Sequence, residues 1–219
     1  HKYVIATGAE VTTGGWPKTS GGSFNDLSND GTYLYVVDNS GNIHKYNISD
    51  GVEQTGSGFP ITADAAYPSV MDGFIYTEDT STDHVRKWNL STGAEVTTGG
   101  FPINIGVDIA SIAAANGAIY VAEDSTLGGD GDIHKYDAAT GAEITTGGYP
   151  ISGDFRELGA DSTRLYAASY GANDSVTTTA YNIGEDYEST TIDAATGQVR
   201  TWDLDAGVVR SRSKLYVQG

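Results

Sequence analysis

Residues 133–150 read IHKYDAATGAEITTGGYP, and this phrase decides the fold because it recurs along the chain. Residues 85–102 read VRKWNLSTGAEVTTGGFP, residues 43–60 read IHKYNISDGVEQTGSGFP, and the chain opens with HKYVIATGAEVTTGGWP. Each copy holds two β-rich runs around a glycine, which is the residue that a tight hairpin with positive φ requires. The turn glycines are Gly8, Gly51, Gly93, Gly141 and Gly197.

A second repeated phrase precedes the hairpins and pairs an aliphatic residue with a tyrosine. It reads GTYLYVVD at 31–38, GFIYTED at 73–79 and GAIYVAED at 117–124, with weaker copies at 163–169 and 213–219. The turn glycines are 43, 42, 48 and 56 residues apart, a period typical of propeller blades or solenoid coils. Each unit is predicted to hold four short strands, exemplified by FNDLS, YLYVV, IHKYN and EVTTG.

Five units of four antiparallel strands predict an all-β, five-bladed β-propeller that occupies residues 1–219 as a single domain. The chain begins with the last two strands of a unit and ends with the first two. Strands near residues 214–218 are therefore expected to pair with residues 1–5 in a composite blade, which closes the ring and leaves no bare edge. A start inside a repeat also indicates a processed chain or a fragment of a longer surface protein.

The unit DGTYLYVVDNSGNIHKYNISDG, at residues 30–51, resembles blades of the WD-repeat-like, YVTN-type and quinoprotein-type propellers. The resemblance extends over essentially the whole chain, and the small blade number is similar to that of tachylectin-type lectins and five-bladed glycosidases. Neither a glycosidase catalytic motif nor the tryptophan-docking motifs of quinoproteins can be matched. Because propellers host lectins, scaffolds, hydrolases and lyases, the resemblance implies a fold and leaves the function open.

Charge and composition narrow the classes of partner. The chain has 29 acidic and 12 basic residues, a formal charge of −17, so its surface repels nucleic acid and anionic lipid. The sequence has no apolar run long enough for membrane insertion, and it has no cysteine, which excludes disulfides and thiol chemistry. Such an acidic surface suits an extracellular location or the surface of a cell or virion.

The HKY phrase places cations at equivalent positions in several units. His1, His44 and His134 share one position, but equivalent positions around a ring lie too far apart to bind one metal ion. The following lysine, Lys45 in one unit, is expected to form a cross-strand ion pair with the acid that ends the preceding strand, Asp38.

An aromatic residue precedes proline at the end of four hairpins. These aromatic residues are Trp16, Phe59, Phe101 and Tyr149. They suit either wedges between neighbouring blades or a ring of platforms on which sugars stack. Both interpretations stay open from the sequence.

The longest and most variable connections join the second strand to the third, or one unit to the next. Both kinds lie on one edge of the sheets, and ligand binding is expected there. In the fifth repeat, residues 168–188 are predicted to be a strandless insertion. Its Tyr170, Asn173, Tyr181 and Tyr187 offer rings and amides suited to a glycan or a protein surface.

An acidic, glycine-rich loop in the third unit reads EDSTLGGDGD at residues 123–132. Asp124, Asp130 and Asp132 suit either a Ca²⁺ site or a solvated acidic loop, and no other cofactor is expected. In GDFRE, at residues 153–157, Asp154, Arg156 and Glu157 come nearest to a catalytic set and are interpreted as chance clustering.

These observations predict a non-catalytic, lectin-like binding module that recognises a glycan or the surface of a partner protein. The alternative is a structural unit that self-assembles in a filament, surface layer or virion appendage. An enzyme such as a propeller glycosidase is the least favoured interpretation, because no copy holds an isolated His/Asp/Glu set, a Ser–His–Asp set or a phosphate loop.

Overall fold

The computed structural model describes residues 1–17, 23–126, 131–170, 176–183, 188–192, 199–203 and 208–211. These residues form β-strands and turns, as predicted for an all-β chain. No helix long and apolar enough to cross a membrane occurs in this part of the chain. The chain divides into two compact units, unit 1 (His1–Asn104) and unit 2 (Ile105–Gly219).

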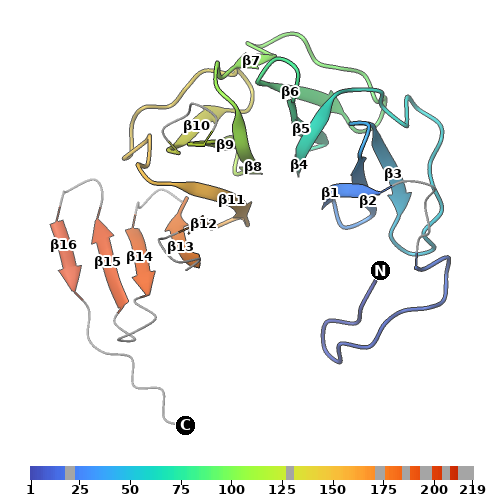
Figure 1. Cartoon of the computed structure of the whole chain (residues 1–219), viewed down its shortest axis with the longest axis horizontal. Coiled ribbons are helices and arrows are strands. Elements are labelled where there is room, and N and C mark those ends of the chain that lie inside the picture. The colour runs from blue at the N-terminus through green and yellow to red at the C-terminus, as the bar shows by residue number, and fades with distance from the viewer. Residues whose placement is uncertain are drawn as a thin grey trace. The chain divides into compact units, whose positions relative to one another are not determined.

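Unit 1 contains two antiparallel sheets, with strand orders β1–β2–β3 and β4–β5–β6–β7 (Figure 1). The strands are β1 (Phe24–Asn29), β2 (Tyr33–Asp38), β3 (Ile43–Asn47), β4 (Ala65–Met71), β5 (Phe74–Asp79), β6 (His84–Asn89) and β7 (Ile103–Asn104). Each strand pairs with the strand that follows it in the sequence, which is the meander of a propeller blade.

Unit 2 contains the sheet β10–β9–β8 and a six-stranded sheet that runs in order from β11 to β16. The strands are β8 (Ile109–Ala115), β9 (Ala118–Glu123), β10 (Ile133–Asp137), β11 (Phe155–Ala160), β12 (Arg164–Tyr170), β13 (Val176–Asn182), β14 (Glu188–Ile192), β15 (Val199–Asp203) and β16 (Val208–Ser211).

The two repeated phrases pair with each other in the same register in three sheets. The tyrosine of the second strand lies opposite the lysine of the third at Tyr35–Lys45, Tyr76–Lys87 and Tyr120–Lys135. The predicted second and third strands of these three repeats are therefore confirmed. The tyrosines are fully buried, so this pair lies in the core of each sheet.

The prediction of a regular fourth strand, exemplified by EVTTG, is wrong. In the first four copies this stretch is joined to the third strand by a single bridge, such as Tyr46–Glu53 or Tyr136–Glu143. The chain then turns through glycines with positive φ and enters the aromatic–Pro pair, and proline has no N–H to donate to a ladder. At Gly58 an added Cβ would lie 2.2 Å from the carbonyl oxygen of Thr92, so the approach of the next hairpin requires glycine there.

The predicted strandless insertion at residues 168–188 is also wrong. It contains the end of β12 and all of β13, which pair from Arg164–Asn182 to Tyr170–Val176. The physical reason lies in the segment VTTTAYN, because β-branched and aromatic residues favour strands.

Each unit buries its own hydrophobic core, and the first strands of neighbouring sheets are joined directly. In unit 1 the backbone N–H of Val70 donates to Ser28 Oγ at 3.2 Å. In unit 2 the N–H of Leu158 donates to Ser111 Oγ at 3.0 Å. The same polar link therefore connects β1 to β4 and β8 to β11.

The first residues of the chain form an isolated hairpin with a bridge between Tyr3 and Glu10. Lys2 Nζ and Trp16 Nε1 both donate to the carbonyl oxygen of Ile48, at 2.9 and 3.2 Å, so this hairpin packs on the first sheet. Residues 214–218, its predicted partner, lie outside the described residues. Ring closure and the number of five blades therefore stay predictions.

Candidate functional site

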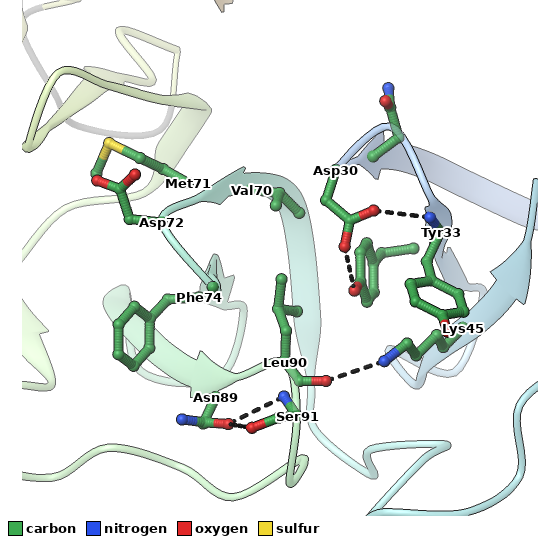
Figure 2. Close-up of a pocket in the computed structure, with 13 residues that line it drawn as sticks. Asp30, Tyr33, Lys45, Val70, Met71, Asp72, Phe74, Asn89, Leu90 and Ser91 are labelled. Atoms are coloured by element: carbon green, nitrogen blue, oxygen red, sulfur yellow. Dashed lines mark hydrogen bonds between the residues drawn. The ribbon is translucent and has the colours of Figure 1, made fainter.

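A pocket of about 670 Å³ lies between the two sheets of unit 1 (Figure 2). One wall is formed by the β1–β2 turn and by Tyr35 and Lys45 of the first sheet. The other is formed by residues 70–74 around the β4–β5 turn, together with residues 89–91 after β6. The pocket therefore opens among the short, uniform turns, at the other end of the strands from the variable connections.

Asp30 organises the turn of the first wall. Its Oδ1 accepts the backbone N–H groups of Thr32 and Tyr33 at 2.8 and 2.7 Å, and its Oδ2 accepts the hydroxyl of Tyr35 at 2.9 Å. Burial raises the pKa of Asp30, but these hydrogen bonds and the nearby Lys45 outweigh burial and lower it. The carboxylate is thus held ionised and directs its oxygens into its own turn.

Lys45 lines the pocket beside Tyr33. Its Nζ donates to the carbonyl oxygen of Leu90 at 3.0 Å, as Figure 2 shows, and lies 4.2 Å from the ring centroid of Tyr33 and 5.1 Å from that of Phe59. This lysine therefore links the first sheet to the second through a hydrogen bond and cation–π contacts.

The predicted ion pair between Lys45 and Asp38 is wrong. Asp38 instead contacts His44, whose Nε2 lies 3.2 Å from Asp38 Oδ2. The physical reason is the alternation of side chains along a strand, which sends His44 and Lys45 to opposite faces of the sheet.

On the second wall, Asn89 and Ser91 form a compact polar turn. Asn89 Oδ1 accepts the N–H of Ser91 at 2.9 Å and its hydroxyl at 2.7 Å. Val70 and Leu90 also line this side of the pocket, whereas the ring of Phe74 and the carboxylate of Asp72 point away from Tyr33 and Lys45 (Figure 2). The centroid of the Phe74 ring lies 4.3 Å from Lys87 Nζ instead. The pocket thus combines the ring of Tyr33, the ammonium group of Lys45 and the polar turn of Asn89 and Ser91.

The aromatic residues before proline are all buried. Trp16, Phe59, Phe101 and Tyr149 are exposed by 7, 4, 4 and 5 %. The ring centroid of Phe59 lies 6.0 Å from that of Tyr35. The next two repeats hold the corresponding pairs Tyr76–Phe101 and Tyr120–Tyr149. This burial supports the packing interpretation over that of solvent-facing platforms for sugars.

The predicted residues of the fifth repeat are not brought together into a described site. Tyr170 ends β12, and Tyr181 lies in β13, where its ring packs edge-on against Phe155 at 6.3 Å beside the core of unit 2. Asn173 and Tyr187 lie outside the described residues, so their role stays a prediction.

Two of the three predicted calcium ligands have partners within the protein. Asp124 pairs with the guanidinium of Arg156, and Asp132 Oδ1 accepts the backbone N–H of Gly153 at 2.9 Å. Asp130 lies outside the described residues. The described part of the chain contains no group of three or more acidic or histidine side chains placed to hold a metal ion.

Asp154 and Arg156 of the GDFRE segment form ion pairs within the protein. Arg156 Nε lies 3.1 Å from Asp154 Oδ1, and Nη2 donates to Ser125 Oγ at 2.9 Å. With Asp124, they fasten the β9–β10 connection to the start of β11. Sequence reasoning missed this because the partners are about 30 residues apart, as the separations of 31 and 32 residues show.

Sequence reasoning also missed the pocket, because it set aside the uniform turns. One signal was present. Two residues before the repeated tyrosine stands Tyr33 at the pocket, but Phe74, Ala118 and Arg164 in the next three copies. A change of residue type inside an otherwise uniform turn indicates a local role that the fold does not require.

No family model matches the sequence, and no curated protein matches it. Among solved structures, the chain is similar to the WD40 repeats of RRP9, with a TM-score of 0.55 and 12 % identity over 88 % of this chain and 63 % of that one. It is also similar to BamB from Moraxella catarrhalis, with a TM-score of 0.53 and 17 % identity over 73 % of this chain and 43 % of that one.

A third similar structure is hydrazine synthase from Kuenenia stuttgartiensis, with a TM-score of 0.53 and 14 % identity over 93 % of this chain and 70 % of that one. The chain therefore spans less than two thirds of the RRP9 and BamB structures. Together these similarities show that the chain has a β-propeller fold of the WD-repeat-like type.

Proposed function

We propose that the chain is a non-catalytic binding module and that the pocket of unit 1 binds a saccharide unit of a glycan. The observation that carries this proposal is the combination, in one cavity, of the ring of Tyr33 with the polar groups of Lys45, Asn89 and Ser91. A volume of about 670 Å³ is within the usual range for small-ligand sites.

Saccharides need this mixture of groups. Their hydroxyls both donate and accept hydrogen bonds, so they fit a site with the ammonium group of Lys45, the amide of Asn89 and the hydroxyl of Ser91. Their C–H faces pack on aromatic rings, and Tyr33 provides one. The formal charge of −17 favours neutral or cationic glycans over anionic ones.

Binding without cleavage is supported by the state of Asp30. A glycosidase needs one carboxyl group that is protonated near neutral pH to act as the general acid. The hydrogen bonds of the turn instead keep the pKa of Asp30 below its ordinary value. This carboxylate is suited to hold the pocket wall in shape and poorly suited to donate a proton.

The proposal also includes an extracellular or surface location and a closed ring of five blades. In the register of the other sheets, a tyrosine lies opposite each lysine of the HKY phrase. The phrase SKLYVQG at residues 213–219 would then place Tyr216 opposite Lys2. The variable connections, with Asn173 and Tyr187, form a second proposed contact region.

A structural, self-assembling role is the second candidate, and the exposed apolar side chains of unit 1 favour it. Ile5, Leu27 and Val52 are exposed by 101, 57 and 53 %. Such residues can provide contacts between copies. Analytical ultracentrifugation across a range of concentrations tests this role, and a monomer at every concentration would exclude it.

The glycan proposal is tested on an array of neutral, cationic and anionic glycans, followed by titration calorimetry with the best-bound saccharide. Tyr33→Ala and Lys45→Met should each weaken binding, the first by at least about tenfold, since a buried aromatic contact typically contributes more than 1 kcal/mol. Arg164→Ala, at the position of unit 2 that corresponds to Tyr33, is the matched control and should leave the affinity unchanged.

Two results would contradict the proposal. One is an array without any bound glycan, and the other is binding that both pocket variants retain in full. If a pull-down instead captures a protein through the same pocket residues, the site is a protein-binding site. Melting temperatures of all three variants separate a loss of binding from a loss of folding.

A further inference from the structure

His44, in β3, contacts carboxylates from two other segments of the first sheet. Its Nδ1 lies 2.6 Å from Glu53 Oε1, and its Nε2 lies 3.2 Å from Asp38 Oδ2. Asp38 ends β2, whereas Glu53 lies in the segment that returns to bridge Tyr46 after the hairpin turn. One imidazole ring therefore ties three consecutive segments together, and we call this arrangement the His44 clamp.

The complete clamp requires a charged ring. A neutral imidazole has one N–H and can donate to one carboxylate, whereas an imidazolium donates to both. Burial lowers the pKa of His44, but the hydrogen bonds and charges of Glu53 and Asp38 outweigh burial and raise it above its ordinary value. The side chain is 21 % exposed, so the ring can exchange its proton with solvent.

Among the described residues, the charged groups that face His44 are these two carboxylates. From β1, the ring of Phe24 meets the imidazole edge-on at 6.4 Å, and from β3 the ring of Tyr46 stacks on it at 6.2 Å. The electrostatic surroundings of His44 are therefore negative on both sides. Loss of the proton leaves two carboxylates beside a neutral ring that can satisfy one of them.

The next sheet contains the same clamp with an arginine. Arg86 donates to both carboxylate oxygens of Glu95 at 2.7 Å and to Asp79 Oδ2 at 3.2 Å. Arg86 follows Val85 in β6 as His44 follows Ile43 in β3, and Glu95 returns to bridge Trp88 as Glu53 returns to bridge Tyr46. Because arginine stays charged at every accessible pH, this clamp does not titrate.

We propose that the His44 clamp is a pH-sensitive fastening of the returning segment, residues 52–61, to β3, and that the Arg86 clamp is its pH-insensitive counterpart. Because the pKa of His44 is raised on folding, its stabilising contribution is fully present below the pKa of the free imidazole. That contribution is lost as the pH rises through the folded-state pKa. The segment is thus held firmly in mild acid and loosened toward alkaline pH.

The chain contains a matched pair of reporters for this proposal. The N–H of Gln54 donates to Lys45 O at 2.7 Å, directly after the His44 clamp, and the N–H of Val96 donates to Lys87 O at 2.8 Å, directly after the Arg86 clamp. Both hydrogen bonds fasten the returning segment to the third strand. Their exchange protection therefore reads the two clamps separately in one molecule.

The experiment is amide hydrogen exchange by NMR between pH 5 and pH 9, with each rate divided by its intrinsic rate. The protection of Gln54 should fall by up to about tenfold per pH unit between the free and folded pKa values, while that of Val96 stays level. His44→Arg should make Gln54 behave like Val96. Arg86→His should make Val96 behave like Gln54.

His44→Gln provides a variant that is neutral at every pH, and its Gln54 protection should be low and level. The ¹⁵N shifts of the imidazole should report a doubly protonated ring at pH 6. The proposal is overturned if Gln54 and Val96 show the same pH dependence in the unaltered protein. It is equally overturned if His44→Arg leaves the pH dependence of Gln54 unchanged.

Discussion

The two sheets of each unit are joined by the same hydrogen bond at their first strands but by different contacts at their turns. A serine of the first strand receives a backbone N–H from the next sheet in both, Ser28 in unit 1 and Ser111 in unit 2. At the turns of unit 2, Asn116 Nδ2 donates to Ser162 O at 2.6 Å and bridges the two sheets. At the turns of unit 1, the pocket lies between Asp30 and Asp72 instead.

This difference indicates that the side chain of one turn residue decides whether the turns of two neighbouring sheets are hydrogen-bonded or separated by a recess. Asn116 and Asp30 are the corresponding residues of the first turn in the first sheet of each unit, within ANGAIY and NDGTYLY. The amide of Asn116 has N–H groups that can reach across, whereas an ionised carboxylate has none. The shared sheet geometry therefore allows either a bridged junction or a recess, and the side chain selects between them.

The largest effect is expected from Gly58→Ala, which places a methyl group where the chain after the hairpin around Gly51 approaches the next hairpin at Thr92. The substitution adds a Cβ 2.2 Å from Thr92 O at a φ of +81°. The combined clash and backbone strain should lower the free energy of unfolding by about 3 kcal/mol or more. Gly73→Ala, with a φ of +80° and nothing within 4 Å, should cost about 1 kcal/mol. Equal losses in urea denaturation would contradict the clash.

Lys45→Met should weaken the junction between the two sheets of unit 1 by about 2 kcal/mol. Methionine keeps much of the packing volume but loses the hydrogen bond to Leu90 O and the cation–π contact with Tyr33. Denaturant unfolding measures the stability change. Full stability in this variant would mean that the lysine head group contributes nothing to the junction.

Asn116→Asp should remove the hydrogen bond that bridges the two sheets of unit 2 and separate their turns. The carboxylate faces the carbonyl oxygen of Ser162 without a donor, so the free energy of unfolding should fall by about 1–2 kcal/mol. Asp72→Asn, in the exposed β4–β5 turn of unit 1, is a surface control and should change stability by less than about 0.5 kcal/mol. A crystal structure of Asn116→Asp with the turns still in contact would refute the comparison.

The smallest effect concerns acid titration of two corresponding turns, residues 30–33 in unit 1 and residues 161–164 in unit 2. In each, the aspartate accepts backbone N–H groups of its own turn. Hydrogen bonds from Thr163 and from the hydroxyl of Tyr166 lower the pKa of Asp161 to about 2, and the pKa of Asp30 is lowered as well. A lowered carboxyl pKa stabilises the fold above the unfolded value, and this contribution is lost as the pH falls through the folded value. ¹³C NMR should show Asp161 titrating near pH 2. Titration near 3.8 would contradict the turn geometry.

Much of the blade could be predicted from the sequence because its signals are local and repeated. The phrases around Tyr35 and Lys45 alternate apolar and polar residues, and three copies fold in the same register. The fourth strand and the segment from Val176 to Asn182 were mispredicted for opposite reasons. The EVTTG stretch has the pattern of a regular strand but is interrupted by glycine and proline. The VTTTAYN stretch has the polar composition of a loop, but its threonines favour a strand.

The candidate site was less predictable than the blade. The sequence directed attention to long connections and to aromatic residues before proline, which the structure buries. The pocket instead lies among short turns, and its one sequence signal is Tyr33, which differs from its counterparts in the next three copies. That signal alone does not tell that the turn faces an open recess.

The sequence by itself determined where strands and turns lie, because glycine placement, β-branched runs and alternation act over a few residues. The tertiary structure alone decided which side chains meet across sheets. Lys45 reaches Leu90 over 45 residues, and Asn116 reaches Ser162 over 46. These contacts depend on how one blade is placed against the next, and packing between blades is a property of distant segments that local patterns do not encode.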